Sequence, residues 1–140
     1  MNDCMNILYE PSSTRDDYGE LVITASNPCV IPFYFEIPVI RYDLDENERY
    51  QEQIPAEDKI VFVFKNSIYE ITPVLTKEYT NIKENVAFLV LGPGDLACLY
   101  GKRTYQLGVH WYGQNGKIKK VLIRDLPVKV EGVVQNVPSF

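Results

Sequence analysis

The chain has 140 residues, of which 46% are hydrophobic and 24% charged, and its formal net charge is −5. This length suits one domain with a substantial core. The acidic balance argues against nucleic-acid binding, because phosphate recognition needs a clustered basic surface. The densest basic cluster is Lys117, Lys119 and Lys120, which we interpret as the solvated arm of a hairpin.

The amino-terminal segment, residues 1–19, is polar and without a regular pattern, and it predicts an irregular arm. It lacks the basic leader and apolar run of a secretory signal, and no stretch approaches the length of a membrane span. Cys4, Cys29 and Cys98 include no C-x-x-C pair. We therefore expect reduced thiols in a protein made in the cytosol, with Cys29 and Cys98 in the core.

The first predicted strand covers residues 21–25, and the next run, 30–40, alternates in polarity. Because Pro32 and Pro38 cannot donate backbone hydrogen bonds, this run belongs at a sheet edge or a bend. One face of the run is predicted to be buried, and it consists of Ile31, Phe33, Phe35, Ile37 and Val39.

Residues 41–58 form a predicted acidic loop. Asp43, Asp45 and Glu48 place oxygen atoms at a spacing that resembles a calcium-binding loop. The glycine of such a loop is absent at the sixth position, and the twelfth position is Ile54 instead of glutamate. We therefore prefer a solvated acidic loop to a metal site.

The middle of the chain predicts three further elements. Residues 59–65 are apolar on both faces, which is typical of a central strand. A turn at Asn66 and Ser67 leads into a predicted strand over 68–75, and the polar residues 76–85 follow without one. Residues 86–91 predict another buried strand.

The last third of the chain predicts a short helix and a hairpin. Asp95 caps a helical turn, and 104–112 alternates with Trp111 on its buried face. Asn115–Gly116 predicts a hairpin with a type I′ turn. Strands over 118–123 and 128–134 complete about eight short strands.

This succession of strands and turns predicts an all-β fold, an antiparallel β-sandwich of immunoglobulin-like type. The sandwich domain covers residues 20–134, and residues 135–140 form a carboxy-terminal tail.

No constellation of catalytic residues stands out. His110 is the single histidine, and no G-x-S-x-G motif accompanies it. It alternates with Trp111, so we expect a surface or interface histidine. The Gly92-x-Gly94 segment lacks the lysine of a phosphate loop. We therefore expect no enzymatic activity and no cofactor.

The ten tyrosines leave a carbohydrate-binding alternative open, because flat rings stack on sugar faces. Tyr42, Tyr50 and Tyr112 are the candidate glycan contacts. The competing interpretation, which we favour, is that these rings pack at strand edges or subunit contacts.

The order of motifs in the second half of the chain resembles a small β-sandwich of tailed-phage virions. The shared features are an apolar strand, an acidic turn, a tyrosine strand, a hairpin and a closing apolar strand. They correspond to Ile60–Lys65, Gly94–Asp95 with Leu99-x-Gly101, Tyr105, Asn115–Gly116 and Pro127–Val130. The pattern is similar to the N-terminal module of baseplate upper proteins and to head-fibre or related virion structural proteins. The long 41–58 loop departs from it.

This resemblance implies a non-enzymatic virion protein, made in the host cytoplasm, that acts as an adaptor or decoration at the capsid, neck or baseplate. Its partners would be other virion proteins and further copies of itself, without nucleic acid or membrane. The apolar residues of the predicted arm and tail have little core to join, so they are candidate subunit contacts: Ile7, Leu8, Tyr9, Val137 and Phe140. A β-sandwich module that recognises a cell-surface glycan is the alternative function.

Overall fold

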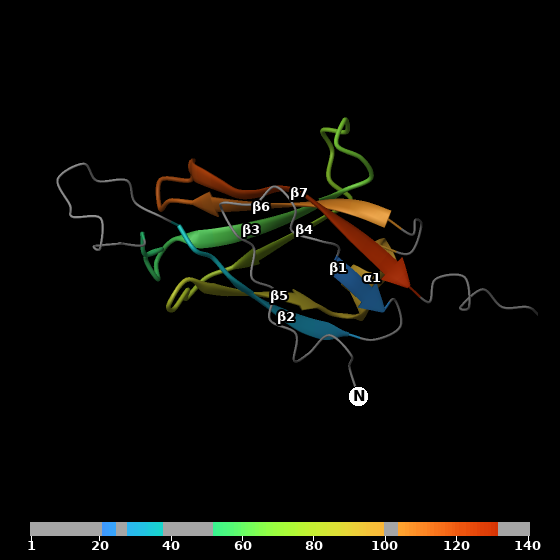
Figure 1. Ribbon diagram of the computed structural model, residues 1–140, viewed down its shortest axis with the longest axis horizontal. Helices are drawn as coiled ribbons and strands as arrows, with labels where there is room; N and C mark the ends of the chain where they lie inside the picture. Colours follow the sequence, from blue (N-terminus) through green and yellow to red (C-terminus); the bar gives the residue numbers. More distant parts are fainter. Residues whose placement is uncertain (1–20, 25–27, 38–51, 100–103, 132–140) are drawn as a thin grey trace, which may run out of the picture.

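The computed structural model describes residues 21–24, 28–37, 52–99 and 104–131. Within them, the chain forms seven strands in two sheets and one short helix (Figure 1). The five-stranded sheet has the order β1 (Leu21–Thr24), β7 (Ile118–Glu131), β6 (Thr104–Tyr112), β3 (Lys59–Lys65) and β4 (Leu75–Tyr79). The two-stranded sheet pairs β2 (Cys29–Tyr34) with β5 (Val86–Leu91), and the helix α1 is Pro93–Cys98. The predicted all-β character is confirmed.

Strand pairing confirms the predicted central strand. β3 pairs with β4 on one side and with β6 on the other. β2 pairs only with β5 among the described residues, which places Pro32 at a sheet edge as predicted. The expectation of purely antiparallel pairing is wrong for one pair, because β1 runs parallel to β7.

Both sheets contribute to one hydrophobic core. The alternating faces predicted for β2 and β6 are buried, with Phe33 and Leu107 fully inaccessible to solvent. The rings of Phe33 in β2 and Phe62 in β3 lie 5.2 Å apart at their centroids. The two sheets are therefore joined by side-chain packing between their facing sides.

The predicted strand over 68–75 is wrong. These residues form a connection in which Ile68, Tyr69 and Ile71 are exposed, and the strand β4 starts at Leu75. Its sequence, LTKEY, is largely polar because it is an edge strand with alternate residues exposed. Apolar content alone therefore misled the prediction in this region.

The two strands predicted at 118–123 and 128–134 are one strand, β7, which extends over Ile118–Glu131. The register between β6 and β7 shifts next to Gly108, where β7 contains an irregularity. A Cβ atom at Gly108 would lie 3.4 Å from the backbone oxygen of Arg124. The close approach of the two backbones thus favours glycine at this position.

The predicted hairpin at Asn115–Gly116 is confirmed, but its turn type is not. Gly116 has a positive φ of 78°, and Asn115 does not. The Gly116 amide donates to the Gly113 carbonyl, and the Gly113 amide donates to the Lys117 carbonyl. This is the pattern of a type I turn followed by a left-handed glycine, which is the next most common hairpin connection.

The cysteines differ from their prediction as reduced core thiols. Cys29 is buried at the start of β2, as predicted, but it is disulfide-bonded. Cys98, at the end of α1, is a free and exposed thiol. The helix ends there, so the apolar neighbours of Cys98 in the sequence do not enclose it.

The short helix α1 has Gly92 as its N-cap, so the prediction that Asp95 occupies the cap is wrong in position. Asp95 is the third helical residue, and its carboxylate binds back to the cap. The Gly92 amide donates to Asp95 Oδ2 at 2.9 Å, and Lys77 Nζ lies 2.9 Å from the same oxygen. Burial raises the pKa of Asp95, but the Gly92 hydrogen bond and Lys77 together bring the pKa below its usual value. Asp95 thus links the helix to β4.

Candidate functional site

The outward side of the two-stranded sheet carries no charged residue, and its one polar side-chain group is the Tyr34 hydroxyl. Because side chains alternate along a strand, Cys29, Ile31 and Phe33 of β2 point into the core. The opposite side carries three cross-strand pairs in register, and we call it the β2–β5 outer face: Val30 with Val90, Pro32 with Phe88, and Tyr34 with Val86.

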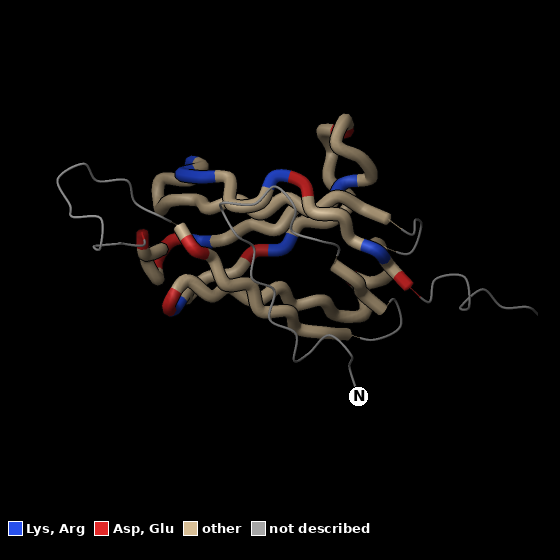
Figure 2. Tube along the Cα trace, in the orientation of Figure 1, with Lys and Arg blue, Asp and Glu red and all other residues tan. Residues whose placement is uncertain are grey.

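Two residues of the β2–β5 outer face are open to solvent. Phe88 keeps 36% of its surface accessible, and Val90 keeps 46%. The three residues from β2, which are Val30, Pro32 and Tyr34, are half-buried. Neither β2 nor β5 contains a charged residue, and Figure 2 shows charge on the larger sheet and on the loops instead. Contiguous apolar surface that is open to solvent can mark an interaction site, so this face is a candidate for one.

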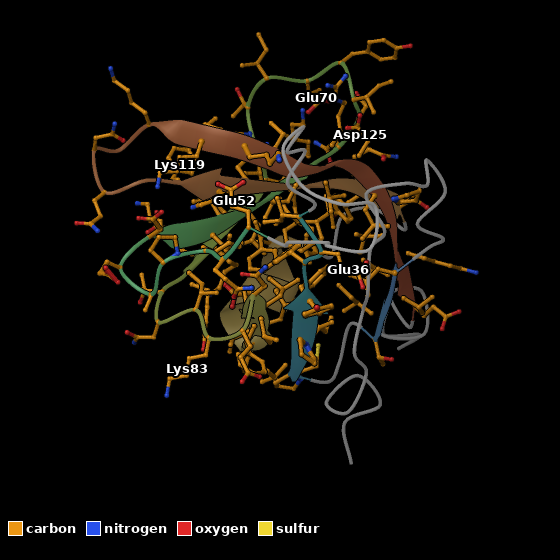
Figure 3. The ribbon with its side chains drawn as sticks, turned by 60° about the vertical axis from the view of Figure 1, so that its left-hand side comes forward. Glu36, Glu52, Glu70, Lys83, Lys119 and Asp125 are labelled. Carbon is orange, nitrogen blue, oxygen red and sulfur yellow. The ribbon has the colours of Figure 1, made fainter. Side chains whose placement is uncertain are left out.

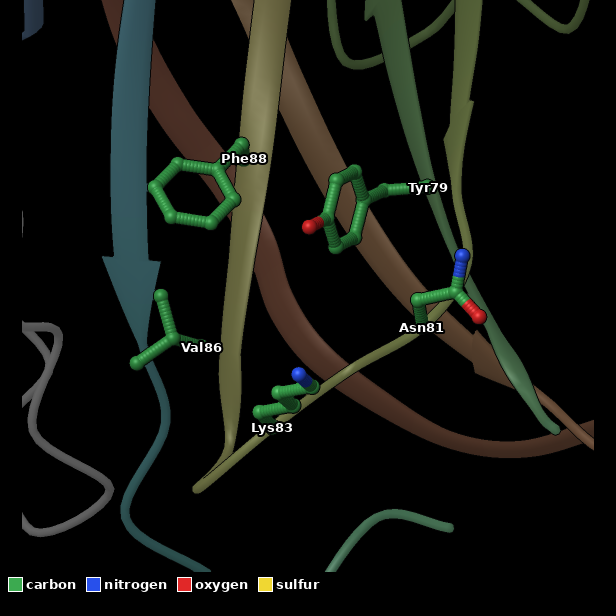
Figure 4. A pocket seen from close by; sticks show the side chains of 5 residues that line it. All are labelled: Tyr79, Asn81, Lys83, Val86 and Phe88. Carbon is green, nitrogen blue, oxygen red and sulfur yellow. The ribbon is translucent and has the colours of Figure 1, made fainter. Parts of the chain in front are cut away.

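A pocket of about 430 Å³ adjoins this face, where the edge strand β4 comes beside β5 (Figure 4). The rings of Tyr79 and Phe88 meet edge to face, with centroids 5.4 Å apart. The polar side-chain groups of the pocket lining are the Tyr79 hydroxyl, the Asn81 amide and the Lys83 ammonium. The lining, which we call the β4–β5 pocket, consists of Tyr79, Asn81, Lys83, Val86 and Phe88.

A buried asparagine fixes the turn that carries this pocket. Asn85 is 1% exposed, and its Nδ2 donates to the backbone oxygens of Phe35 and Glu52. Its Oδ1 accepts from the Ile54 amide at 2.9 Å. Asn81 and Asn85 both adopt positive φ angles, a conformation that asparagine tolerates better than most residues. The hydrogen bonds of Asn85 therefore connect the turn before β5 to two other segments of the chain.

The sequence did not single out this pocket. Asn81 and Asn85 lie in the polar stretch 76–85, where no element was predicted. Tyr79 and Phe88 are nine residues apart and meet only because β4 and β5 lie side by side. The two asparagines near Lys83 were the only local signal of a tight turn.

A second polar cluster lies around Asp58. This carboxylate is 2% exposed, and it accepts hydrogen bonds from Trp111 Nε1 and Lys119 Nζ, both at 2.9 Å. The Lys119 ammonium also lies 5.2 Å from the centre of the Trp111 ring. The prediction of a solvated loop over 41–58 is therefore wrong at Asp58, and Lys119 is more than a solvated hairpin lysine.

The electrostatics of Asp58 indicate a structural role. Burial raises the pKa of this carboxyl, but the hydrogen bonds from Lys119 and Trp111 and the charge of Lys119 outweigh it, so the pKa lies below its ordinary value. The group remains a carboxylate at neutral pH with its acceptor oxygen already engaged. It thus ties the start of β3 to β6 and β7.

His110 is half-buried on the outward side of β6, opposite to Trp111 as predicted. Its burial lowers the pKa of the imidazole, and the positive charge of Lys65 lowers it further. The ring lies 6.5 Å from that of Tyr112. In the described ranges, no group of three metal-ligating side chains comes together.

Most other candidates lie outside the described residues. This applies to the calcium candidates, to two glycan candidates and to all subunit-contact candidates: Asp43, Asp45, Glu48, Tyr42, Tyr50, Ile7, Leu8, Tyr9, Val137 and Phe140. Tyr112 is half-buried at the end of β6, with Lys59 Nζ 5.8 Å from its ring centre. It belongs to the larger sheet.

Comparison with known proteins adds no relative. No family model matches the chain, and no curated protein matches it. In the described part of the chain, no helix is long and apolar enough to cross a membrane. The features that a function can be argued from are thus the β2–β5 outer face and the β4–β5 pocket beside it.

Proposed function

We propose that this protein is a non-enzymatic structural component of a bacteriophage virion, an adaptor or decoration at the capsid, neck or baseplate. It docks on other virion subunits through the β2–β5 outer face. The observation that carries this proposal is the set of three uncharged, largely apolar cross-strand pairs, with Phe88 and Val90 exposed. Burying such a face against a partner is favourable by about 25 cal/mol per Å² of apolar surface.

The fine architecture in this proposal is an immunoglobulin-like β-sandwich. It is supported by two sheets that share one core and by the motif order that resembles baseplate upper and head-fibre modules. In this proposal the chain buries strand edges against neighbouring subunits of a symmetric assembly. The chain would be made in the host cytoplasm and reside in the virion, where a disulfide at Cys29 can persist.

Particle composition tests this function. Virions of the phage that encodes the chain are purified, analysed by mass spectrometry and labelled with antibody for electron microscopy. We expect a fixed copy number and label confined to one place on the particle. Absence of the chain from purified virions would contradict the proposal.

A variant pair tests the docking face. Val90→Asp places a charge on the β2–β5 outer face, and we expect it to abolish incorporation into particles, because a buried unpaired carboxylate opposes docking. Val121→Asp is the matched control, since Val121 is equally exposed, at 45%, on the larger sheet. Equal incorporation of the two variants would mean that another surface docks.

Glycan recognition is the second candidate function, and the β4–β5 pocket is the observation that favours it. The rings of Tyr79 and Phe88 offer apolar surface, and Asn81 and Lys83 offer donors for sugar hydroxyls. A glycan array together with thermal shift tests it. A sugar that raises the melting temperature of the wild type, but not that of Lys83→Ala, would support this function. An array without binders would reject it.

A further inference from the structure

The connection between β3 and β4 projects exposed apolar side chains. This connection, residues 66–74, which we call the β3–β4 loop, rises above the sheets in Figure 1. Tyr69 keeps 87% of its surface accessible and Ile71 keeps 94%, with Glu70 between them. Large apolar side chains this exposed contribute nothing to the core of their own domain.

Local hydrogen bonds hold the loop in shape. The Tyr69 amide donates to Ser67 Oγ, and the Glu70 amide donates to the Ser67 carbonyl, each at 3.3 Å. Asn66 Nδ2 lies 3.3 Å from Glu70 Oε2, and the Val74 amide donates to the Phe64 carbonyl at the base. A preorganised tip loses less conformational entropy when it binds.

The tip of the loop and the β4–β5 pocket both carry apolar groups, and their charges are opposite. The tip presents an aromatic ring and an aliphatic chain around one carboxylate, Glu70. The pocket presents Tyr79 and Phe88 beside one exposed ammonium, that of Lys83. Its volume of about 430 Å³ lies in the range of roughly 300–1,000 Å³ that is usual for a site that encloses a ligand.

One chain cannot bring its own tip to its own pocket. The loop enters β4 at Leu75, whereas the pocket starts at Tyr79, where β4 ends. A strand rises about 3.3 Å per residue, so β4 separates the two features by more than about 13 Å. Figure 3 shows Glu70 and Lys83 at opposite ends of the molecule.

We propose that the tip of the β3–β4 loop of one copy docks into the β4–β5 pocket of a second copy, head to tail. This inference rests on the proposed virion role and names the partner for its subunit contacts. Ile71 and Tyr69 fill the pocket, and Glu70 lies against Lys83 of the neighbour. Such a contact uses two different surfaces, so repeating it gives a ring when the rotation closes and a filament when it does not.

Solution mass measured by light scattering over a concentration series tests the contact. We expect the wild type to form species larger than the 16.1 kDa monomer. Ile71→Asp on the tip and Lys83→Glu in the pocket each weaken association by about tenfold or more, the loss usual for a central interface residue. Val121→Asp, on the larger sheet, keeps the wild-type mass. Circular dichroism confirms that each variant is folded.

Mixing separates a head-to-tail contact from a symmetric one. A copy with Ile71→Asp keeps its pocket, and a copy with Lys83→Glu keeps its tip. Their 1:1 mixture therefore forms a dimer and stops there, because the remaining tip and pocket are both altered. The doubly substituted chain, Ile71→Asp with Lys83→Glu, stays monomeric. Adding Glu70→Lys to Lys83→Glu restores opposite charges and the larger species.

Three outcomes would overturn the inference: a wild type that is monomeric throughout, variants with wild-type mass, or a mixture without a dimer. None of them affects the virion proposal, which is tested by the composition of purified particles and by the incorporation of Val90→Asp into them. Conversely, a chain that is absent from virions but assembles head to tail would defeat the proposed function and leave this contact in place.

Discussion

At the scale of single residues, Asp58 shows how burial and partners decide what a carboxylate does. It ends an acidic stretch of the sequence, yet it is enclosed and receives two hydrogen bonds at 2.9 Å, from Trp111 and Lys119. A buried carboxylate without such donors would be strongly destabilising. With them, it links three strands.

Replacing Asp58 changes how stability depends on pH. The folded state lowers the pKa of Asp58 below the ordinary 3.8, so its contribution is complete above about pH 4 and is lost as the pH falls through the folded pKa. We expect Asp58→Asn to lower the free energy of unfolding at pH 7 by about 1–3 kcal/mol. Urea denaturation at pH 7 and pH 3 measures both effects.

As the pH falls, the free energy of unfolding should decrease less steeply for Asp58→Asn than for the wild type. Part of the pH dependence should remain, because the pKa of Asp95 is also lowered in the folded state. Glu78→Gln is the control, because the exposed pair of Glu78 with Lys59 is worth about 0–1 kcal/mol. Equal acid dependence of wild type and Asp58→Asn would contradict the assignment.

At the scale of elements, turns and edges decide where strands begin and end. The hairpin between β6 and β7 depends on a left-handed residue at Gly116, and the strand β7 continues past an irregularity opposite Gly108. β4 has few apolar residues and is defined by its pairing with β3. Hydrogen bonding between strands thus outweighs local composition here.

The same substitution at two glycines should have opposite effects. Gly116→Ala places a Cβ at a positive φ of 78°, and we expect a loss of about 1–2 kcal/mol of unfolding free energy. Gly94 lies in α1, and a Cβ atom added by Gly94→Ala would have no other atom within 4 Å. Because alanine favours a helix over glycine by about 0.5–1 kcal/mol, stability should hold or rise. Urea denaturation measures both, and a stable Gly116→Ala would refute the turn assignment.

At the scale of the whole molecule, two sheets of unequal size share one core. The small sheet is uncharged on both sides: one side faces the core, and the other is the β2–β5 outer face. The pocket and the β3–β4 loop lie at the two ends of β4. The three surfaces therefore belong to one folded unit, and they can act together in an assembly.

The shared core predicts cooperative unfolding. Phe33→Ala removes a fully buried ring that packs on Phe62 of the other sheet, and such truncations cost about 3–5 kcal/mol. We expect Trp111 fluorescence, which reports on the larger sheet, and far-ultraviolet circular dichroism to give coincident transitions, shifted together by the substitution. Separate transitions would show that the small sheet unfolds alone.

Local pattern determined much of the fold. The alternation in 104–112, the apolar run 59–65 and the Asn115–Gly116 dipeptide predicted β6, β3 and the hairpin, because these signals depend on near neighbours in the chain. The contribution of Asp95 to the start of the helix was predicted for the same reason, although the cap itself is Gly92. The prediction of a strand over 68–75 failed because apolar residues of this segment, such as Ile68 and Ile71, are exposed on a loop.

Only the tertiary structure decided the candidate sites. Trp111 meets Asp58 across 53 positions of sequence, and Tyr79 meets Phe88 because two edge strands lie side by side. The sequence by itself determined strand periodicity, turns and the apolar nature of β2 and β5. Which apolar face is enclosed and which is left for a partner depends on how the sheets pack, since burial is a property of the assembled surfaces and not of any one segment.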